Sequence, residues 1–150
     1  MNVVLVEHDE NKGKNYCFAV PDTLLHHVHK GDNVVCDTRR GRQSGRVVSD
    51  ILSGIQAEET MADKNATFPL KNILTITTCV DMDKIKIPRY LKQSIPSGEK
   101  IAARVNEYKA NKRFNTEVRV SEDGTLEDGY TAYLVAKMLG LDRIPITINA

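Results

Sequence analysis

Residues 117–148 constrain the fold most, because they change twice between the pattern of a strand and the pattern of a helix. Residues 118–120 alternate apolar and polar side chains, as a half-buried strand does, and the Asp-Gly pair at 123–124 is a hairpin signal. Apolar side chains at 133–139 then predict a helix with one broad buried side, and residues 144–148 alternate again as a strand. This order predicts strand, turn, short strand, helix and strand.

A polar corner stands directly before the predicted helix, at Asp128, Gly129, Tyr130 and Thr131. The first backbone N–H groups of a helix have no partner within the helix, and they suit a phosphate group. These four residues are therefore a candidate phosphate- or nucleotide-binding site. They could equally form a structural corner in which Asp128 caps the helix, and the charge of Asp128 would then repel an anion.

The composition is that of a globular protein, with 41% hydrophobic and 27% charged residues in a chain of 150. No segment resembles a membrane span or a signal peptide, and three cysteines without a signal peptide predict reduced thiols and a cytoplasmic protein without a membrane partner. Three histidines cluster at 26, 27 and 29, but no further ligand follows at a metal-site spacing. We expect neither a metal nor a cofactor.

Residues 1–80 have the pattern of a small antiparallel β-barrel, because short strand-like runs alternate with turn signals. The expected strands are 3–6, 16–20, 33–38, a fourth beginning at 46, and 68–76. Residues 39–45, with two glycines, are expected to form a loop. Residues 54–67 lack a clear period and predict a long loop or a short helix.

Residues 81–150 are expected to form a second, α/β domain. Ser97 is a suitable N-cap for a helix in which Ile101, Val105 and Tyr108 share one apolar face. The strand and helix pattern of 117–148 follows. The predicted class is therefore α+β, with a β-barrel in 1–80 and an α/β domain in 81–150.

Basic side chains gather in two places. The first group is a set of four arginines in the expected loop and at the start of the fourth strand: Arg39, Arg40, Arg42 and Arg46. The second is the stretch 84–113, in which nine lysines and arginines face two glutamates, a local charge of +7. Lys100 and Arg104 share one face of the helix expected there. Both groups are candidate contacts for the phosphates of DNA or RNA.

Both groups also have an ordinary structural explanation. The arginines could pair with Asp32, Asp37 or Asp50 around a solvated turn, and lysines on a helix often cover apolar surface. Aromatic side chains for base stacking are scarce, with three Phe, five Tyr and no Trp.

Several short motifs run through the second half: IKIP at 85–88, IPSGEK at 95–100, Tyr108, LEDGYTAYLVAK at 126–137, LGL at 139–141 and IPI at 144–146. With these motifs the segment resembles the ParB N-terminal/sulfiredoxin-like superfamily, in particular the short ParB-like proteins of bacteria, phages and mobile elements. The resemblance implies a phosphate-binding helix with the pattern G-x-x-R-x-x-A, whose arginine holds a nucleotide or DNA phosphate. Gly129 and Ala136 match this pattern, whereas Ala132 stands at the arginine position. A methyl group cannot replace a bidentate guanidinium.

The first half resembles two β-modules, the N-terminal barrel of the helicase PriA and the PSP1-type domain. The matching pieces are Tyr16-Cys17-Phe18, Gly31-Asp32-Asn33-Val34-Val35 and residues 38–48.

These observations predict a nucleic-acid-associated binding protein of bacterial, phage or mobile-element origin, without catalysis, that contacts phosphates through its basic surfaces. One alternative is a ParB-like nucleotide-binding, nucleotide-hydrolysing or nuclease enzyme that uses the helix N-terminus at Gly129. A second is a protein-interaction module with a degenerate ParB-like fold. A basic side chain reaching the Gly129 corner, such as Arg89 or Arg119, would favour the nucleotide site. The oligomeric state stays open.

Overall fold

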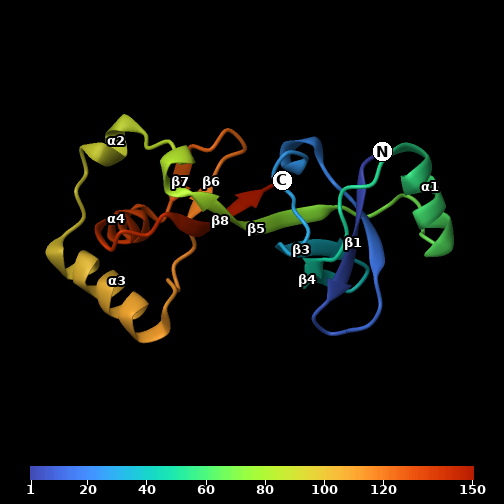
Figure 1. Cartoon of the computed structure of the whole chain (residues 1–150), viewed down its shortest axis with the longest axis horizontal. Coiled ribbons are helices and arrows are strands. Elements are labelled where there is room, and N and C mark those ends of the chain that lie inside the picture. The colour runs from blue at the N-terminus through green and yellow to red at the C-terminus, as the bar shows by residue number, and fades with distance from the viewer. The chain divides into compact units, whose positions relative to one another are not determined.

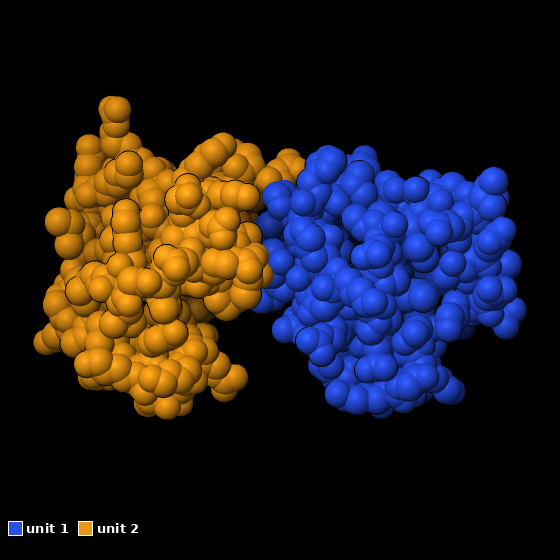
Figure 2. Space-filling model, viewed as in Figure 1, with its two compact units in different colours: residues 1–78, 148–150 blue, residues 79–147 orange.

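The computed structural model describes residues 1–150 and has the predicted mixed α+β class. The chain divides into two compact units (Figure 2). Unit 1 comprises residues 1–78 and 148–150, and unit 2 comprises residues 79–147. None of the helices is long and apolar enough to cross a membrane.

Unit 1 is mainly an antiparallel sheet (Figure 1). Its strands are β1 (Val3–His8), β2 (Tyr16–Ala19), β3 (Asn33–Thr38), β4 (Gly41–Val47) and the first part of β5 (Ile73–Asp81). They are hydrogen-bonded in the order β2-β1-β4-β3-β5. A short 3-10 helix, η1 (Asp22–Leu24), follows β2 and buries Leu24 completely. Helix α1 (Gly54–Asp63) buries Ala57 and Met61 against Val3 and Cys17.

The sheet of unit 1 is not closed into a barrel, which corrects the barrel expected for residues 1–80. The edge strand β2 pairs with β1 along its length. On its other side, β2 forms only an isolated bridge, between Ala19 and Asn72, which is the residue directly before β5. β2 has four residues, and Pro21, which has no N–H group, follows closely. This strand is therefore too short to form a closing ladder with β5.

The loop expected at residues 39–45 is also wrong, because β4 already begins at Gly41. Thr38 pairs with Gly41, so the turn consists of Arg39 and Arg40. Gly45 then lies close to β1, since a Cβ atom at this position would be 2.8 Å from the carbonyl oxygen of Glu7. A glycine is what allows β4 to pair with β1 here.

Unit 2 combines the end of β5 with short strands and three helices (Figure 1). Its elements are η2 (Met82–Lys84), α2 (Arg89–Lys92), α3 (Gly98–Asn111), β6 (Arg119–Val120), β7 (Leu126–Asp128), α4 (Tyr130–Met138) and β8 (Arg143–Asn149). The strand order is β5-β8-β6-β7, with β6 parallel to β8 and antiparallel to β7. Strand β8 continues into unit 1 with its last residues.

Two predicted features of unit 2 are confirmed. The hydroxyl of Ser97 accepts a hydrogen bond from the backbone N–H of Lys100 at 3.3 Å and caps α3. The chain turns at Asp123-Gly124 between β6 and β7. Helix α3 packs against α4, which brings the beginnings of these two helices into the same part of unit 2.

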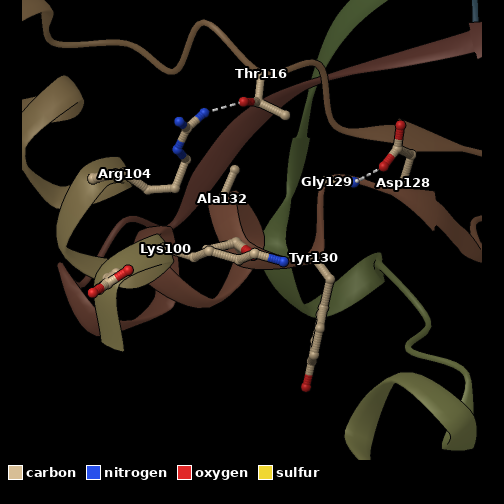
Figure 3. A pocket seen from close by; sticks show the side chains of 10 residues that line it. Lys100, Arg104, Thr116, Asp128, Gly129, Tyr130 and Ala132 are labelled. Atoms are coloured by element: carbon tan, nitrogen blue, oxygen red, sulfur yellow. Dashed lines mark hydrogen bonds between the residues drawn. The ribbon is translucent and has the colours of Figure 1, made fainter. Parts of the chain in front are cut away.

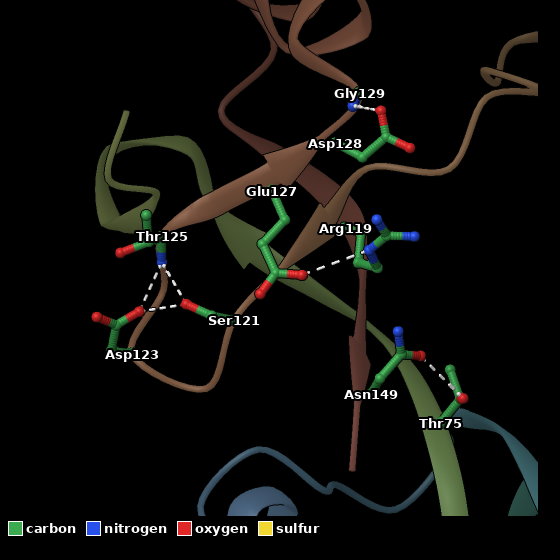
Figure 4. Close-up of polar contacts among 9 residues, drawn as sticks. All are labelled: Thr75, Arg119, Ser121, Asp123, Thr125, Glu127, Asp128, Gly129 and Asn149. Carbon is green, nitrogen blue, oxygen red and sulfur yellow. Dashed lines mark hydrogen bonds and ion pairs between the residues drawn. The ribbon is translucent and has the colours of Figure 1, made fainter. Parts of the chain in front are cut away.

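Polar contacts hold the turn between β6 and β7 (Figure 4). The backbone N–H of Thr125 donates to the hydroxyl of Ser121 at 3.2 Å and to the carboxylate of Asp123 at 3.1 Å. The Ser121 hydroxyl itself donates to Asp123. These hydrogen bonds, that of Ser121 first, lower the pKa of Asp123 to about 2. Next to the turn, Arg119 pairs with Glu127 at 3.4 Å.

Candidate functional site

A pocket of about 570 Å³ lies in unit 2 between the first turns of α3 and the N-terminus of α4 (Figure 3). Its lining residues are Glu99, Lys100, Ala103 and Arg104 of α3, Thr116, and Asp128, Gly129, Tyr130, Thr131 and Ala132. Sites for small molecules usually measure roughly 300–1,000 Å³, so the pocket has the size of such a site. It brings two separately predicted groups together, the basic residues of α3 and the corner before α4.

The N-terminus of α4 depends on Gly129 in two ways. Its φ angle is +88°, in the left-handed region that favours glycine. A Cβ atom here would also lie 2.7 Å from the carbonyl oxygen of Glu117 and 2.9 Å from the Cα atom of Val118. The chain can therefore enter α4 in this way only with glycine.

No side chain caps α4, so its first N–H groups are left for other partners. The first backbone bond within the helix runs from the N–H of Tyr133 to the carbonyl oxygen of Gly129, at 3.0 Å. The N–H groups of Tyr130, Thr131 and Ala132 come before this bond, and all three residues line the pocket. A helix N-terminus of this kind carries a partial positive charge.

Asp128 does not cap the helix, contrary to the structural explanation of this corner. Its carboxylate accepts a hydrogen bond from the neighbouring N–H of Gly129, at 2.9 Å. Figure 3 shows the carboxylate on the opposite side of Gly129 from Arg104. The free N–H groups of α4 are therefore not occupied by this acid.

Arg104 is the most firmly held basic side chain of the pocket. Its guanidinium donates to the hydroxyl of Thr116 and forms an ion pair with Glu107 at 3.3 Å. The Glu107 side chain is only 11% exposed and accepts a second hydrogen bond, from the backbone N–H of Asn115. In Figure 3, Arg104 lies beside Ala132, the position at which the ParB-like pattern has arginine.

The basic residues proposed earlier for this corner are not the ones that reach it. Arg119 pairs with Glu127 instead, and neither Arg89 nor Arg119 lines the pocket. Sequence reasoning also missed Thr116 and Glu107. Glu107 follows Arg104 by three residues, a spacing that favours an ion pair on a helix. No sequence pattern points to Thr116.

The four arginines of the β3–β4 hairpin lie in unit 1 and are all exposed: Arg39, Arg40, Arg42 and Arg46. None of them forms an ion pair, although this was the ordinary structural explanation for them. Asp32 pairs instead with His29, and Asp37 pairs with Lys71. A hollow of about 360 Å³ on β3–β5 is lined by Asp9, Asn33, Val34, Val35, Ser44, Gly45, Thr75 and Thr77, so no arginine borders it.

The unit 2 pocket therefore offers donors for an anion, from Lys100, Arg104 and the N-terminus of α4. Three residues with hydroxyl groups, Thr116, Tyr130 and Thr131, and two exposed acidic residues, Glu99 and Asp128, complete its polar lining. No histidine or cysteine lines it. No three His, Cys, Asp or Glu side chains in the chain are grouped so that they could hold a metal ion.

No protein-family model and no curated protein matches the chain. A comparison with solved structures finds similarity to a Pnob8-like ParB-N domain in its C2221 crystal form, with a TM-score of 0.42 and 22% sequence identity. The match covers 48% of this chain and 28% of that chain. A likeness of this extent leaves the ParB-like resemblance of unit 2 a prediction, and the PriA- and PSP1-like resemblance of unit 1 is one as well.

Proposed function

We propose that unit 2 binds a nucleotide through its phosphate groups, in the pocket between α3 and α4. The observation that carries this proposal is that Lys100 and Arg104 line the same pocket as the uncapped N-terminus of α4. The N–H groups and the helix dipole favour an anion. A guanidinium adds a planar set of donors that matches phosphate oxygens, and an ammonium adds a mobile positive charge.

Two further properties favour a nucleotide over inorganic phosphate or a long nucleic acid. The volume of about 570 Å³ suits a small molecule. The lining also includes the acidic residues Glu99 and Asp128 and the aromatic residue Tyr130. Carboxylates accept hydrogen bonds from ribose hydroxyl groups, and a tyrosine ring offers apolar contact to a base. A bare phosphate would use none of these groups.

The alanine at position 132 is compatible with this function. Ala132 is almost fully buried and leaves space at the start of α4, while Arg104 supplies a guanidinium from α3. We propose binding without catalysis, which is also the expectation from the sequence. We therefore propose nucleotide binding in the unit 2 pocket as the leading function, in place of the nucleic-acid-binding surface predicted from the sequence.

Isothermal titration of the full chain with CTP, ATP and GTP tests the proposal. A hydrogen bond to a charged group contributes about 1.5–3 kcal/mol, so Lys100→Ala and Arg104→Ala should each weaken binding about tenfold to a hundredfold. Lys109→Ala, an exposed lysine of α3 outside the pocket, is the matched control and should bind as the wild type does. No nucleotide binding by the wild type, or an equal loss in the control, would contradict the proposal.

The hairpin of unit 1 supports a second candidate function, the binding of a nucleic-acid backbone. Its four arginines are exposed and form no ion pairs, which leaves them available for phosphates. The affinity for a labelled DNA duplex, measured by fluorescence anisotropy, should fall with salt, and the variant Arg40→Ala/Arg42→Ala should bind more weakly with a shallower salt slope. The control Lys12→Ala/Lys14→Ala removes the same charge from another exposed loop of unit 1. If both variants bind DNA equally, the hairpin is not the contact surface.

An interaction module is the remaining alternative. It would be supported by the absence of both nucleotide and DNA binding in a correctly folded wild-type chain.

A further inference from the structure

The segment after α3 folds back along the helix and contacts it at three successive places. The ring centroids of Phe114 and Tyr108 are 5.1 Å apart. The N–H of Asn115 donates to the carboxylate of Glu107, and the hydroxyl of Thr116 accepts a hydrogen bond from Arg104. Residues 114–116 thus meet residues 108, 107 and 104 in reverse order. We call residues 112–116 the return segment. Its last contact reaches the pocket, because both Thr116 and Arg104 line it.

The start of the return segment is also fixed in the backbone. Lys112 ends α3 in the left-handed conformation, with φ +58°, and its N–H donates to the carbonyl oxygen of Tyr108 at 2.7 Å. Such a residue reverses the direction of the chain at the end of a helix. The position of Thr116 is therefore set by two contacts that precede it in the chain, the turn at Lys112 and the hydrogen bond from Asn115 to Glu107.

We propose that Thr116 is a positioning residue, which holds the guanidinium of Arg104 in the orientation that receives the phosphate. This inference rests on the proposed nucleotide function of the pocket. A free arginine side chain has several rotatable bonds, and binding would have to order them. Thr116 and Glu107 order Arg104 before a ligand arrives. Because a guanidinium has five N–H donors, some remain for the ligand after these two contacts.

Glu107 acts on the charge of Arg104 as well as on its position. The carboxylate of Glu107 compensates the positive charge of Arg104. Of the two basic residues that line the pocket, Lys100 is therefore the one whose charge no ion pair compensates. Arg104 then contributes chiefly directed hydrogen bonds, and Lys100 contributes charge. The substitution Glu107→Gln would change both properties together, which makes Thr116 the cleaner position for a test.

The experiment compares Thr116→Val, which keeps the shape and removes the hydroxyl, with Thr116→Ser, which keeps the hydroxyl. Nucleotide affinity is measured by titration in the wild-type and in the Arg104→Ala backgrounds. We expect Thr116→Val to weaken binding about threefold to tenfold in the wild-type background and to have no further effect without Arg104. Thr116→Ser should retain wild-type affinity. A loss of the same size in both backgrounds would mean that Thr116 merely maintains the pocket, and would overturn the inference.

A measurement without nucleotide separates this inference from the proposed function. The Nε–Hε resonance of Arg104 in nitrogen-15 NMR reports how ordered the guanidinium is. We expect an ordered side chain in the wild type and in Thr116→Ser, and a mobile one in Thr116→Val. A mobile Arg104 in the wild type would overturn the positioning role even if nucleotide binds. If Arg104 is ordered but the chain binds no nucleotide, the proposed function is overturned, and so is the role of Thr116 in nucleotide binding.

Discussion

Replacement of Gly129 by alanine should destabilise unit 2 strongly, because two independent effects act at this residue. Its φ angle of +88° is unfavourable for any residue with a Cβ atom, by about 1–2 kcal/mol. The added Cβ atom would also meet the carbonyl oxygen of Glu117 at 2.7 Å and the Cα atom of Val118 at 2.9 Å. These are backbone atoms, which cannot rotate away, and overpacking of this kind costs about 1–3 kcal/mol. We expect a loss of about 2–5 kcal/mol in the free energy of unfolding.

The other end of α4 provides a matched control. Gly140 follows the helix with a φ angle of +73°, but a Cβ atom there would meet no heavy atom within 4 Å. Gly140→Ala should therefore show only the backbone effect, about 1–2 kcal/mol. Urea unfolding followed by far-ultraviolet circular dichroism gives both values. If Gly129→Ala is no more destabilising than Gly140→Ala, the close approach of Glu117 to the start of α4 does not exist, and the pocket geometry would be refuted.

Two further predictions concern polar contacts of unit 2. Ser97→Ala removes the cap of α3 and should lower the free energy of unfolding, measured by urea unfolding, by about 1 kcal/mol. Ser97→Asp should retain the wild-type value, because aspartate is also a good N-cap. If both variants lose the same free energy, the Ser97 side chain does not cap the helix. The pKa of Asp123 is lowered from the ordinary 3.8 to about 2, so its carboxylate stabilises the folded state above pH 3.8, and this contribution disappears as the pH falls towards 2. Thermal melting of Asp123→Asn should thus differ from the wild type at pH 5 and approach it at pH 2, and a difference that does not depend on pH would contradict this assignment.

Local signals predicted the local features of unit 2 well. Ser97 marked the start of α3, and the Asp123-Gly124 pair marked the hairpin, because capping and turn formation depend on a few neighbouring residues. The start of α4 after Gly129 was expected for the same reason. In unit 1, the fourth strand was expected to begin at residue 46, but β4 begins at Gly41. Its inward positions before Val47 are Gln43 and Gly45, which show no hydrophobic alternation although the strand pairs on both sides.

Features that depend on distant residues could not be read from such signals. Whether β2 meets β5 over a full ladder depends on the lengths of strands more than fifty residues apart, and the expected barrel was therefore wrong. The candidate site shows the same limit. Lys100 and Arg104 were assigned to a basic surface and Gly129 to a separate corner, and only the packing of α3 against α4 places them in one pocket.

The division of the chain has a consequence for the order in which its parts can be completed on the ribosome. Unit 1 includes residues 148–150, and Ile148 is 1% exposed. The backbone N–H of Ala150 also donates to the carbonyl oxygen of Leu74 at 2.8 Å. The hydroxyl of Thr75 donates to the side-chain oxygen of Asn149 (Figure 4). All of unit 2 must therefore be synthesised before unit 1 receives its last core residue. Domains often fold in turn from the N-terminus during translation, but here the first unit begins first and is completed last.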